Sequence, residues 1–398
     1  MKLVIKFKNF DVSWILIIYI ALKPLYLSAS GTMQVCDLFF AASVVYLVFA
    51  KGRFAFTKYV VSTIKNLMFL VLYLAVVNGV WYFITTDQAL LKKMLFYVFN
   101  LIAFCICSIV ATSVGLDKLK CAIAKGCCLS ALITAAGIIV GRGLRARNTG
   151  FFNNPNQLGY YALIIFTALL LWPTAFSTFE KVTVALVSVY ATLSSGSKAA
   201  IIGLAIMVLF YVAIGREKIT AKKLAIQIAL LLTFVAFVYY FLYGESHVIT
   251  SNATLSYVRQ RILNMAREND SSFGLGRGYN RVYEMGNNVF WGMGEGAYNR
   301  FQTLKGLEVH STYASILVSY GIIGALLFLV CLKNVIIIPG NVKRNLCCLS
   351  GIALYSLTHN GIRNTLLWIL LAVTFLEGDD ALKDDQGMEC ISDKGTEG

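Results

Sequence analysis

The residues with the clearest chemical potential are a histidine and an acidic neighbour at the edge of an apolar segment. His310 precedes Ser-Thr-Tyr and a long apolar run, and Glu308 lies two residues before it. A neutral imidazole at such an edge can accept a proton near pH 7, and a nearby carboxylate can orient it. A lone histidine is also often a structural hydrogen-bonding residue, so its position alone leaves both roles open.

A second stretch places arginines where a helix is expected to begin. Arg145 and Arg147 precede Gly-Phe-Phe-Asn-Asn-Pro-Asn, in which Asn154 or Asn156 can cap a helix that starts at Pro155. A helix N-terminus attracts phosphate, so this stretch is a candidate anion site. The alternative is a capped helix with solvated arginines.

The turn Ser-Ser-Gly-Ser before Lys198 has the same character. Hydroxyl groups and backbone amides at the start of the following apolar helix can hold a phosphate, and Lys198 can add a point charge. A simple turn with a lysine that reaches toward the membrane interface explains the pattern equally well.

Arginines also stand in two later stretches. Ten residues separate Arg281 from Gly292, and a guanidinium offers a bidentate fork for pyrophosphate oxygens. Thr-His-Asn-Gly-Ile-Arg places His359 and Arg363 between two short apolar spans, where polar groups serve a site or pair with each other. The Gly-Leu-Gly-Arg-Gly run around Arg277 is similar to a phosphate loop, but no strand precedes it, and we assign it no such role.

The composition predicts that a membrane protein holds these stretches. Of the 398 residues, 58% are hydrophobic and 14% are charged, against about 45–50% and about 25% in soluble domains. The formal charge of +15 fits basic cytoplasmic loops better than nucleic-acid binding, because no separate basic domain or groove-reading motif is present. The ten cysteines are expected to be mostly small buried hydrophobic residues. No pair has zinc-ligand spacing, and neither a metal ion nor another cofactor is expected.

The apolar segments predict an all-α polytopic fold with about twelve transmembrane helices. Several have the length of about 20 residues that crosses hydrocarbon. With the N-terminus in the cytosol, most lysines and arginines outside the large loop fall in cytoplasmic loops, as the positive-inside rule requires. The segments lie at 12–27, 33–50, 66–84, 94–113, 119–140, 157–176, 181–194, 199–214, 224–243, 310–332, 346–359 and 362–377.

The chain divides into five predicted parts. They are transmembrane helices over 1–140, helices with two candidate phosphate-binding turns over 141–243, a large outer loop over 244–309, transmembrane helices over 310–377, and a polar cytoplasmic tail over 378–398.

The large outer loop carries basic residues that the positive-inside rule does not favour there, which suggests a negatively charged partner at that surface. A second helical stretch is expected over 279–289, followed by a turn at Gly-Met-Gly-Glu-Gly, residues 292–296. An amphipathic helix along the membrane interface is predicted from the helical spacing of Leu255, Val258, Ile262 and Met265.

Taken in order over about residues 140–365, these stretches resemble one family. The set comprises the arginines before Gly-Phe-Phe-Asn-Asn-Pro-Asn, the Ser-Gly-Ser-Lys turn, the outer loop with Arg281 and Gly-Met-Gly-Glu-Gly, and His310 separated by ten residues from Gly-Ile-Ile-Gly. This order resembles the O-antigen polymerase and O-antigen ligase superfamily of bacterial envelope glycosyltransferases.

The resemblance implies a multi-pass enzyme of the bacterial inner membrane whose active site faces the periplasm. It implies a saccharide donor on undecaprenyl pyrophosphate and catalysis without a metal ion. Three residues would bind the pyrophosphate, namely Arg147, Lys198 and Arg281, and His310 would be the general base. The family often has arginine at the position of Lys198, and lysine lacks the bidentate fork. Candidate supporting residues are Arg145, Asn156, Glu308, His359 and Arg363.

We predict a polymerase that moves a growing glycan from undecaprenyl pyrophosphate to the non-reducing end of a new lipid-linked repeat, with inversion. Its expected partners are lipid-linked oligosaccharides, membrane lipid and a chain-length regulator. The Asn-Asn-Pro-Asn-Gln-Leu-Gly-Tyr-Tyr and Thr-His-Asn-Gly-Ile-Arg-Asn runs favour this choice. The alternative enzyme is a ligase that transfers finished chains to lipid A–core. A flippase or transporter for the same lipid is the alternative from another class, and predicts ionisable residues at mid-membrane and related halves.

Overall fold

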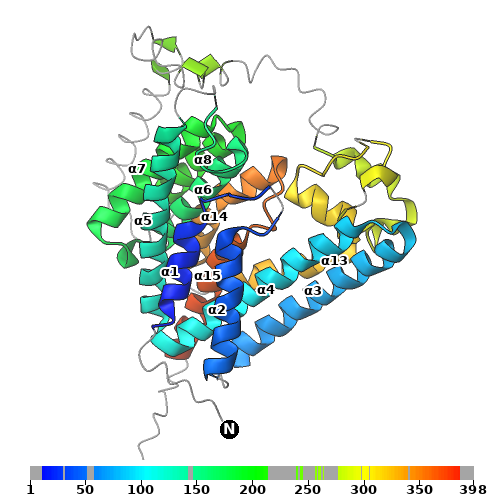
Figure 1. Cartoon of the computed structure of the whole chain (residues 1–398), viewed down its shortest axis with the longest axis horizontal. Helices are drawn as coiled ribbons and strands as arrows, with labels where there is room; N and C mark the ends of the chain where they lie inside the picture. Colours follow the sequence, from blue (N-terminus) through cyan, green and yellow to red (C-terminus); the bar gives the residue numbers. More distant parts are fainter. Residues whose placement is uncertain are drawn as a thin grey trace, which may run out of the picture.

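The structure is a computed structural model in which the regular elements are helices (Figure 1). It describes residues 11–29, 32–51, 58–141, 147–213, 277–296, 298–303, 305–338 and 341–385, and residues 239, 240, 243, 244, 256, 257, 259, 260 and 263. No strand occurs within these ranges, so the predicted all-α class is confirmed for the described part of the chain.

The predicted apolar segments coincide with helices. The segment at 224–243 and the amphipathic helix predicted around 255–265 lie largely outside the described residues; each of the other segments contains a helix. The helices are α1 (Ser13–Leu22), α2 (Val35–Lys51), α3 (Lys58–Thr85), α4 (Gln88–Val114), α5 (Leu116–Val140), α6 (Pro155–Leu171), α7 (Thr178–Ser195), α8 (Lys198–Ala213), α13 (Thr312–Ile336), α14 (Val342–Thr358) and α15 (Thr365–Asp385). The last of these extends into the segment 378–398, which was predicted to be a polar tail.

Within the described residues, four helices are long and apolar enough to cross a membrane by length and composition. They are Val60–Thr85, Gln88–Val114, Leu116–Val140 and Thr312–Ile336. Shorter apolar helices accompany them at Ser13–Leu22, Val35–Leu47, Pro155–Leu171, Lys198–Ala213 and Thr365–Gly378. This pattern supports a multi-pass membrane protein, and the count of twelve spans stays a prediction.

Most helices pack side by side around one apolar core, with α1 against α5, α6 against α7 and α8 against α14 (Figure 1). The contact between α8 and α14 depends on two glycines. A Cβ atom at Gly203 would lie 2.7 Å from the carbonyl oxygen of Gly351, and one at Gly351 would lie 2.5 Å from that of Gly203. Small residues allow such backbone approach where the bilayer gives no hydrophobic drive for helix association.

Two basic residues that the sequence assigns to the cytoplasmic side meet at one end of this bundle. Lys120 of α5 and Arg344 of α14 both pair with Glu377 of α15, at 3.0 and 2.6 Å. The indole nitrogen of Trp172 donates to the same carboxylate at 3.3 Å. These helix ends therefore lie together, and the side of the membrane that they face stays a prediction.

Helices α3, α4 and α13 extend away from this bundle and carry the 277–310 loop near their far end (Figure 1). The predicted helical stretch at 279–289 is present as two short 3-10 helices, η3 (Tyr279–Glu284) and η4 (Gly286–Val289). A third, η5 (Tyr298–Arg300), follows the glycine-rich turn. Both η3 and η4 contact α13.

Helix α13 is broken at Gly321, whose φ of 65° and ψ of −169° are not helical. The loop segment 290–294 occupies the break and bonds to the backbone groups that it frees. Such partners matter because the hydrocarbon core of a bilayer supplies none. The bonds run from the Met293 amide to the Val318 carbonyl at 3.0 Å, from the Gly294 amide to the Ser319 carbonyl at 2.7 Å, and from the Ile323 amide to the Phe290 carbonyl at 3.2 Å.

The predicted turn at Gly-Met-Gly-Glu-Gly is confirmed, because Gly292, Gly294 and Gly296 all have positive φ. Gly292 is also the point of closest approach to α13. A Cβ atom there would lie 2.3 Å from the carbonyl oxygen of Ser319. Only glycine therefore allows the turn to fill the break in the helix.

We expect Gly292→Ala to loosen the loop from α13, because the added methyl group must push the two backbones apart. Overpacking of this kind costs about 1–3 kcal/mol. Gly286→Ala is the matched control, since Gly286 also has a positive φ, of 53°, but nothing lies within 4 Å of its Cβ position. Thermal unfolding in detergent and limited proteolysis of the loop measure the effect. Equal destabilisation by the two variants would show that conformational strain alone is responsible.

Candidate functional site

The 277–310 loop is organised from within by Arg281. This side chain is fully buried, with Nε donating to the carbonyl oxygen of Thr303 at 3.1 Å and Nη2 to that of Leu307 at 2.6 Å. Its guanidinium lies over the ring of Phe301, 4.8 Å from the centroid. Arg281 thus holds the end of the loop that leads to His310.

Arg300 performs a similar task at the glycine-rich turn. Its guanidinium donates to the carbonyl oxygens of Met293, Gly294 at 2.9 Å and Gly296 at 3.3 Å. It also lies over the ring of Trp81 on α3, 4.7 Å from the centroid. Burial lowers the pKa of Arg300 to about 10, so it stays charged at neutral pH. The turn is therefore fixed to α3 by a half-buried cation.

A buried carboxylate ties the same turn to the membrane helices. Glu295 is fully buried, and its Oε2 accepts hydrogen bonds from Tyr97 of α4 at 2.7 Å and from Tyr320 of α13 at 3.1 Å. Its Oε1 pairs with Nε of Arg363 at 3.3 Å. Its backbone amide donates to Asn78 of α3 at 2.8 Å. One residue thus joins three helices and the segment between α14 and α15.

The predicted supporting residues Glu308 and Arg363 belong to this network. Arg363 pairs with Glu308 as well as with Glu295, and Glu308 also pairs with Lys93 of α4 at 3.3 Å. Two carboxylates therefore face two cations, which leaves little net charge. The carboxylate of Glu308 pairs with Lys93 and Arg363, and among the described residues no contact between it and a histidine is found.

A second cluster forms where α6 begins. Asn154 caps the helix and accepts from the backbone amide of Asn156 at 2.7 Å, with Pro155 as the first helical residue, as predicted. Nη2 of Arg147 donates to Oδ1 of Asn156 at 2.8 Å, and its Nε donates to the carbonyl oxygen of Ser195 at 2.9 Å. Arg147 therefore bridges the start of α6 and the end of α7.

The turn between α7 and α8 lies against this arginine. Gly196 ends α7 in the left-handed conformation, and α8 begins at Lys198, as the sequence predicts. Lys198 is half-buried. Ser197 is 1% exposed, and its hydroxyl has no hydrogen-bond partner among the described residues. A buried hydroxyl beside a helix N-terminus, next to Arg147, is suited to an anion.

Three stacked rings connect Arg147 to His359. Tyr160 stacks on Tyr355 with centroids 4.6 Å apart, and Tyr355 stacks on His359 with centroids 4.5 Å apart. The hydroxyl of Tyr355 donates to the carbonyl oxygen of Asn156, the residue that Arg147 binds, at 2.9 Å. His359 is thereby fixed on the α6 side of the site.

His310 and Arg277 come from the loop and lie beside this stack. The His310 amide donates to the Arg277 carbonyl at 3.1 Å, and the Tyr279 hydroxyl donates to the carbonyl of Leu357 at 2.7 Å. Burial, followed by the positive charge of Arg277 and, more weakly, that of Arg147, lowers the pKa of His359 to about 3. His359 is therefore neutral at pH 7 and sits within a field of positive charge. The His310 side chain is exposed.

The structure thus divides the predicted site residues. Arg147, Asn156, His310 and His359 come together, with Lys198 on the adjoining turn. Glu308 and Arg363 form the separate ion-pair network, Arg281 lies inside the loop, and Arg145 lies outside the described residues. Their roles stay predictions.

Sequence reasoning missed Arg277, which borders the same cluster. The signal for Arg277 in the sequence was the glycine-rich run on both sides of it. That run was given no phosphate-binding role because no strand precedes it. Gly278 adopts a φ of 81° against Val309, so the chain turns directly after Arg277 and returns beside His310. The glycine serves this turn and not a phosphate loop.

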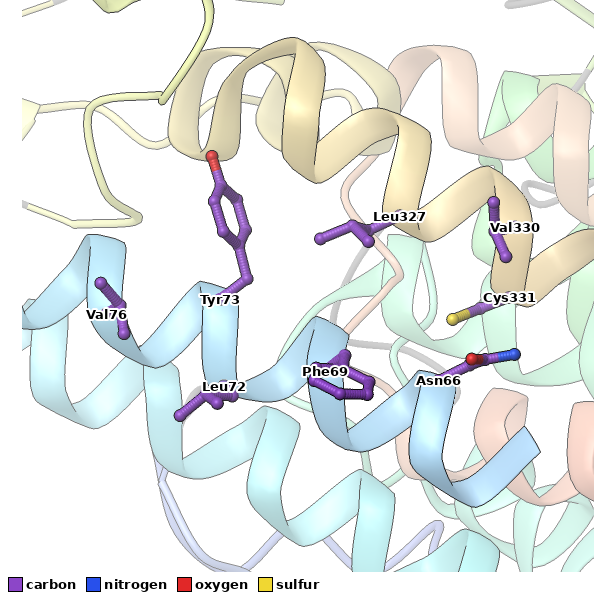
Figure 2. A pocket seen from close by; sticks show the side chains of 8 residues that line it. All are labelled: Asn66, Phe69, Leu72, Tyr73, Val76, Leu327, Val330 and Cys331. Atoms are coloured by element: carbon purple, nitrogen blue, oxygen red, sulfur yellow. The ribbon is translucent and has the colours of Figure 1, made fainter. Parts of the chain in front are cut away.

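An apolar groove of about 430 Å³ lies between α3 and α13, away from these charged groups (Figure 2). Its lining is Asn66, Phe69, Leu72, Tyr73, Val76, Leu327, Val330 and Cys331, with no charged side chain. Tyr73 closes one end and bonds to the carbonyls of Trp291 and Tyr320, at 2.9 and 3.0 Å. The groove is suited to hydrocarbon chains and not to group transfer.

Comparison with known families matches residues 183–329 to the O-antigen ligase family. The matched region runs from within α7 through α8 and the outer loop into α13, and therefore includes Lys198, Arg277, Arg281 and His310. Among curated proteins no match was found. The matched family is one of membrane glycosyltransferase-like enzymes. Over this region the chain is similar to that family, and the match supports the O-antigen ligase and polymerase superfamily.

Proposed function

We propose that this protein is a surface-polysaccharide polymerase. It transfers a growing glycan from undecaprenyl pyrophosphate to the non-reducing end of a new lipid-linked repeat, at the periplasmic face of the inner membrane. The observation that carries the proposal is the cluster in which Arg147, Arg277, His310 and His359 meet beside the N-terminus of α8. The positive charges of Arg147 and Arg277, next to a Ser197 hydroxyl that bonds to none of the described residues, support a diphosphate ligand.

The proposed chemistry assigns one task to each side of this cluster. The hydroxyl oxygen of the acceptor sugar attacks the anomeric carbon of the donor and forms the new glycosidic bond. The bond from that carbon to the pyrophosphate oxygen breaks, and the electron pair leaves with the pyrophosphate. Arg147 and Lys198 stabilise the charge that develops there, in the role that a divalent cation has in other glycosyltransferases.

The proton of the acceptor hydroxyl goes to His310. Its imidazole is exposed at the edge of the cluster, and only its backbone amide is engaged in the described structure. A positioned base of this kind contributes about 10²–10⁴-fold to the rate. Attack opposite the leaving group inverts the anomeric centre.

A ligase is the second candidate, and the family match fits either reaction. The ligase uses the same donor and the same leaving group, so the described cluster serves both reactions. The acceptor distinguishes them, since the ligase transfers to lipid A–core and the polymerase to another lipid-linked repeat.

Reconstitution of the purified protein in vesicles with a defined lipid-linked repeat, with and without lipid A–core, tests the proposal. The polymerase produces a ladder of longer lipid-linked chains from the repeat alone. Product on lipid A–core only would replace the polymerase by the ligase. Movement of the unchanged repeat between leaflets, with no new bond, would replace both by a flippase.

A further inference from the structure

The charged side chains of the outer loop can be sorted by what they already bind. Of its described arginines, Arg281 and Arg300 have carbonyl oxygens of the loop itself as partners. In the 277–310 part of the loop the remaining described arginine is Arg277, which is half-buried. Its guanidinium makes no hydrogen bond or ion pair with the residues that the structure describes.

The acidic side chains of the loop are equally accounted for. The Glu284 carboxylate accepts from the amides of Gln302 and Thr303, at 2.7 and 2.8 Å. Glu295 and Glu308 belong to the ion-pair network of Arg363 and Lys93. In the described part of the loop, no carboxylate is therefore left to neutralise Arg277.

The position of Arg277 is fixed by its neighbours. Its carbonyl oxygen accepts from the amide of His310 at 3.1 Å. Two residues on, Tyr279 bonds to the carbonyl of Leu357 at the end of α14, and it accepts a hydrogen bond from Ser311 at 2.8 Å. Arg277 is therefore held between His310 and the end of α14, where its charge acts on His359.

We propose that Arg277 supplies the contact of the outer loop with the donor diphosphate, and that Arg281 is a positioning residue that holds the loop. This inference rests on the proposed function for its ligand. A guanidinium binds diphosphate oxygens through two parallel hydrogen bonds, and needs free donors to do so. Arg281 donates from Nε and Nη2 to the carbonyls of Thr303 and Leu307. Arg277 lies beside His310, and its guanidinium bonds to none of the residues that the structure describes.

The positioning role of Arg281 follows from where its partners lie. Thr303 and Leu307 precede His310 in the last part of the loop, and their carbonyls converge on one buried guanidinium. Removal of that guanidinium leaves buried carbonyl oxygens without donors, which destabilises the loop as a whole. Its loss would then reduce activity without direct contact to the donor.

The test compares Arg277→Gln, Arg277→Lys and Arg281→Lys, with Lys305→Gln as the control that removes a charge from an exposed residue of the same loop. Binding of inorganic pyrophosphate to each purified protein is measured by calorimetry, thermal unfolding reports loop stability, and the rate is measured against donor concentration. We expect Arg277→Gln to weaken pyrophosphate binding and raise the donor KM by about tenfold or more. Its unfolding temperature should stay unchanged.

Arg277→Lys keeps the charge and should restore part of the binding, whereas Lys305→Gln should bind as the wild type does. Arg281→Lys should lower the unfolding temperature and the turnover, with a smaller change in pyrophosphate affinity. Wild-type pyrophosphate binding by Arg277→Gln, or a specific binding loss in a stable Arg281→Lys protein, would overturn the proposal. The binding measurement does not depend on the acceptor, so failure of the polymerase assignment remains a separate result.

Discussion

Replacing His310 with alanine is expected to lower turnover by about 10²–10⁴-fold, because the acceptor hydroxyl loses its base. The protein should fold and insert normally. The one contact found for His310 in the described structure is its backbone amide, which donates to the Arg277 carbonyl, and alanine retains that amide. Initial rates on a defined lipid-linked repeat measure the effect, and thermal unfolding in detergent confirms that the fold is intact.

His359→Asn separates a role in chemistry from a role in structure. The His359 ring is stacked on Tyr355, and its Nδ1 lies 2.9 Å from the Thr358 hydroxyl. We therefore expect this variant to lose stability as well as activity, unlike His310→Ala. Polymer of normal length and rate from His310→Ala would remove the base assignment.

Glu295→Ala is expected to destabilise the protein by about 3–5 kcal/mol, the usual effect of removing one partner of a buried ion pair. Glu295 is fully buried, and the deletion leaves Arg363 Nε and the hydroxyls of Tyr97 and Tyr320 without their carboxylate. Thermal or denaturant unfolding in detergent measures the loss. Activity should fall with the folded fraction.

The double variant Glu295→Ala, Arg363→Ala is the control for this prediction. It removes the uncompensated charge together with its partner, so it should be less destabilised than the sum of the two single variants. Strict additivity would show that the pair in the structure carries no coupling energy, and that the loop is held to the helices by its other contacts.

Helices were predictable from the sequence where the determinants are local. The start of α6 follows from Asn154 and Pro155, and the join between α7 and α8 follows from Gly196 and the apolar run after Lys198. The break in α13 was not predicted. Gly-Ile-Ile-Gly reads as a continuous apolar helix, and the partners of the interruption, the backbone of residues 290–294 and the Tyr73 hydroxyl, are distant in sequence.

The candidate site was predictable in part for the same reason. Arg147 and Asn156 are close in sequence and were grouped correctly. The surroundings of Arg281 depend on carbonyls 22 and 26 residues away, which no local pattern reveals. The pairing of Glu308 with Arg363 spans 55 residues. The spacing of an arginine in the sequence therefore indicates the region of the site. Whether that arginine binds a ligand or holds the loop depends on its hydrogen-bond partners in the fold.

The interrupted helix α13 also constrains how this protein is made. Its two halves leave amide and carbonyl groups that bond to residues 290–294 and to the Tyr73 hydroxyl, and all of these residues come earlier in the chain. Because synthesis runs from the N-terminus, the complementary strip of backbone already exists when α13 leaves the ribosome. In the native order, α13 inserts after residues 290–294 have been made, so its free backbone groups can bond to them at once. In a circular permutant opened between Val309 and Thr312, α13 would be made first and would insert with these backbone groups unbonded.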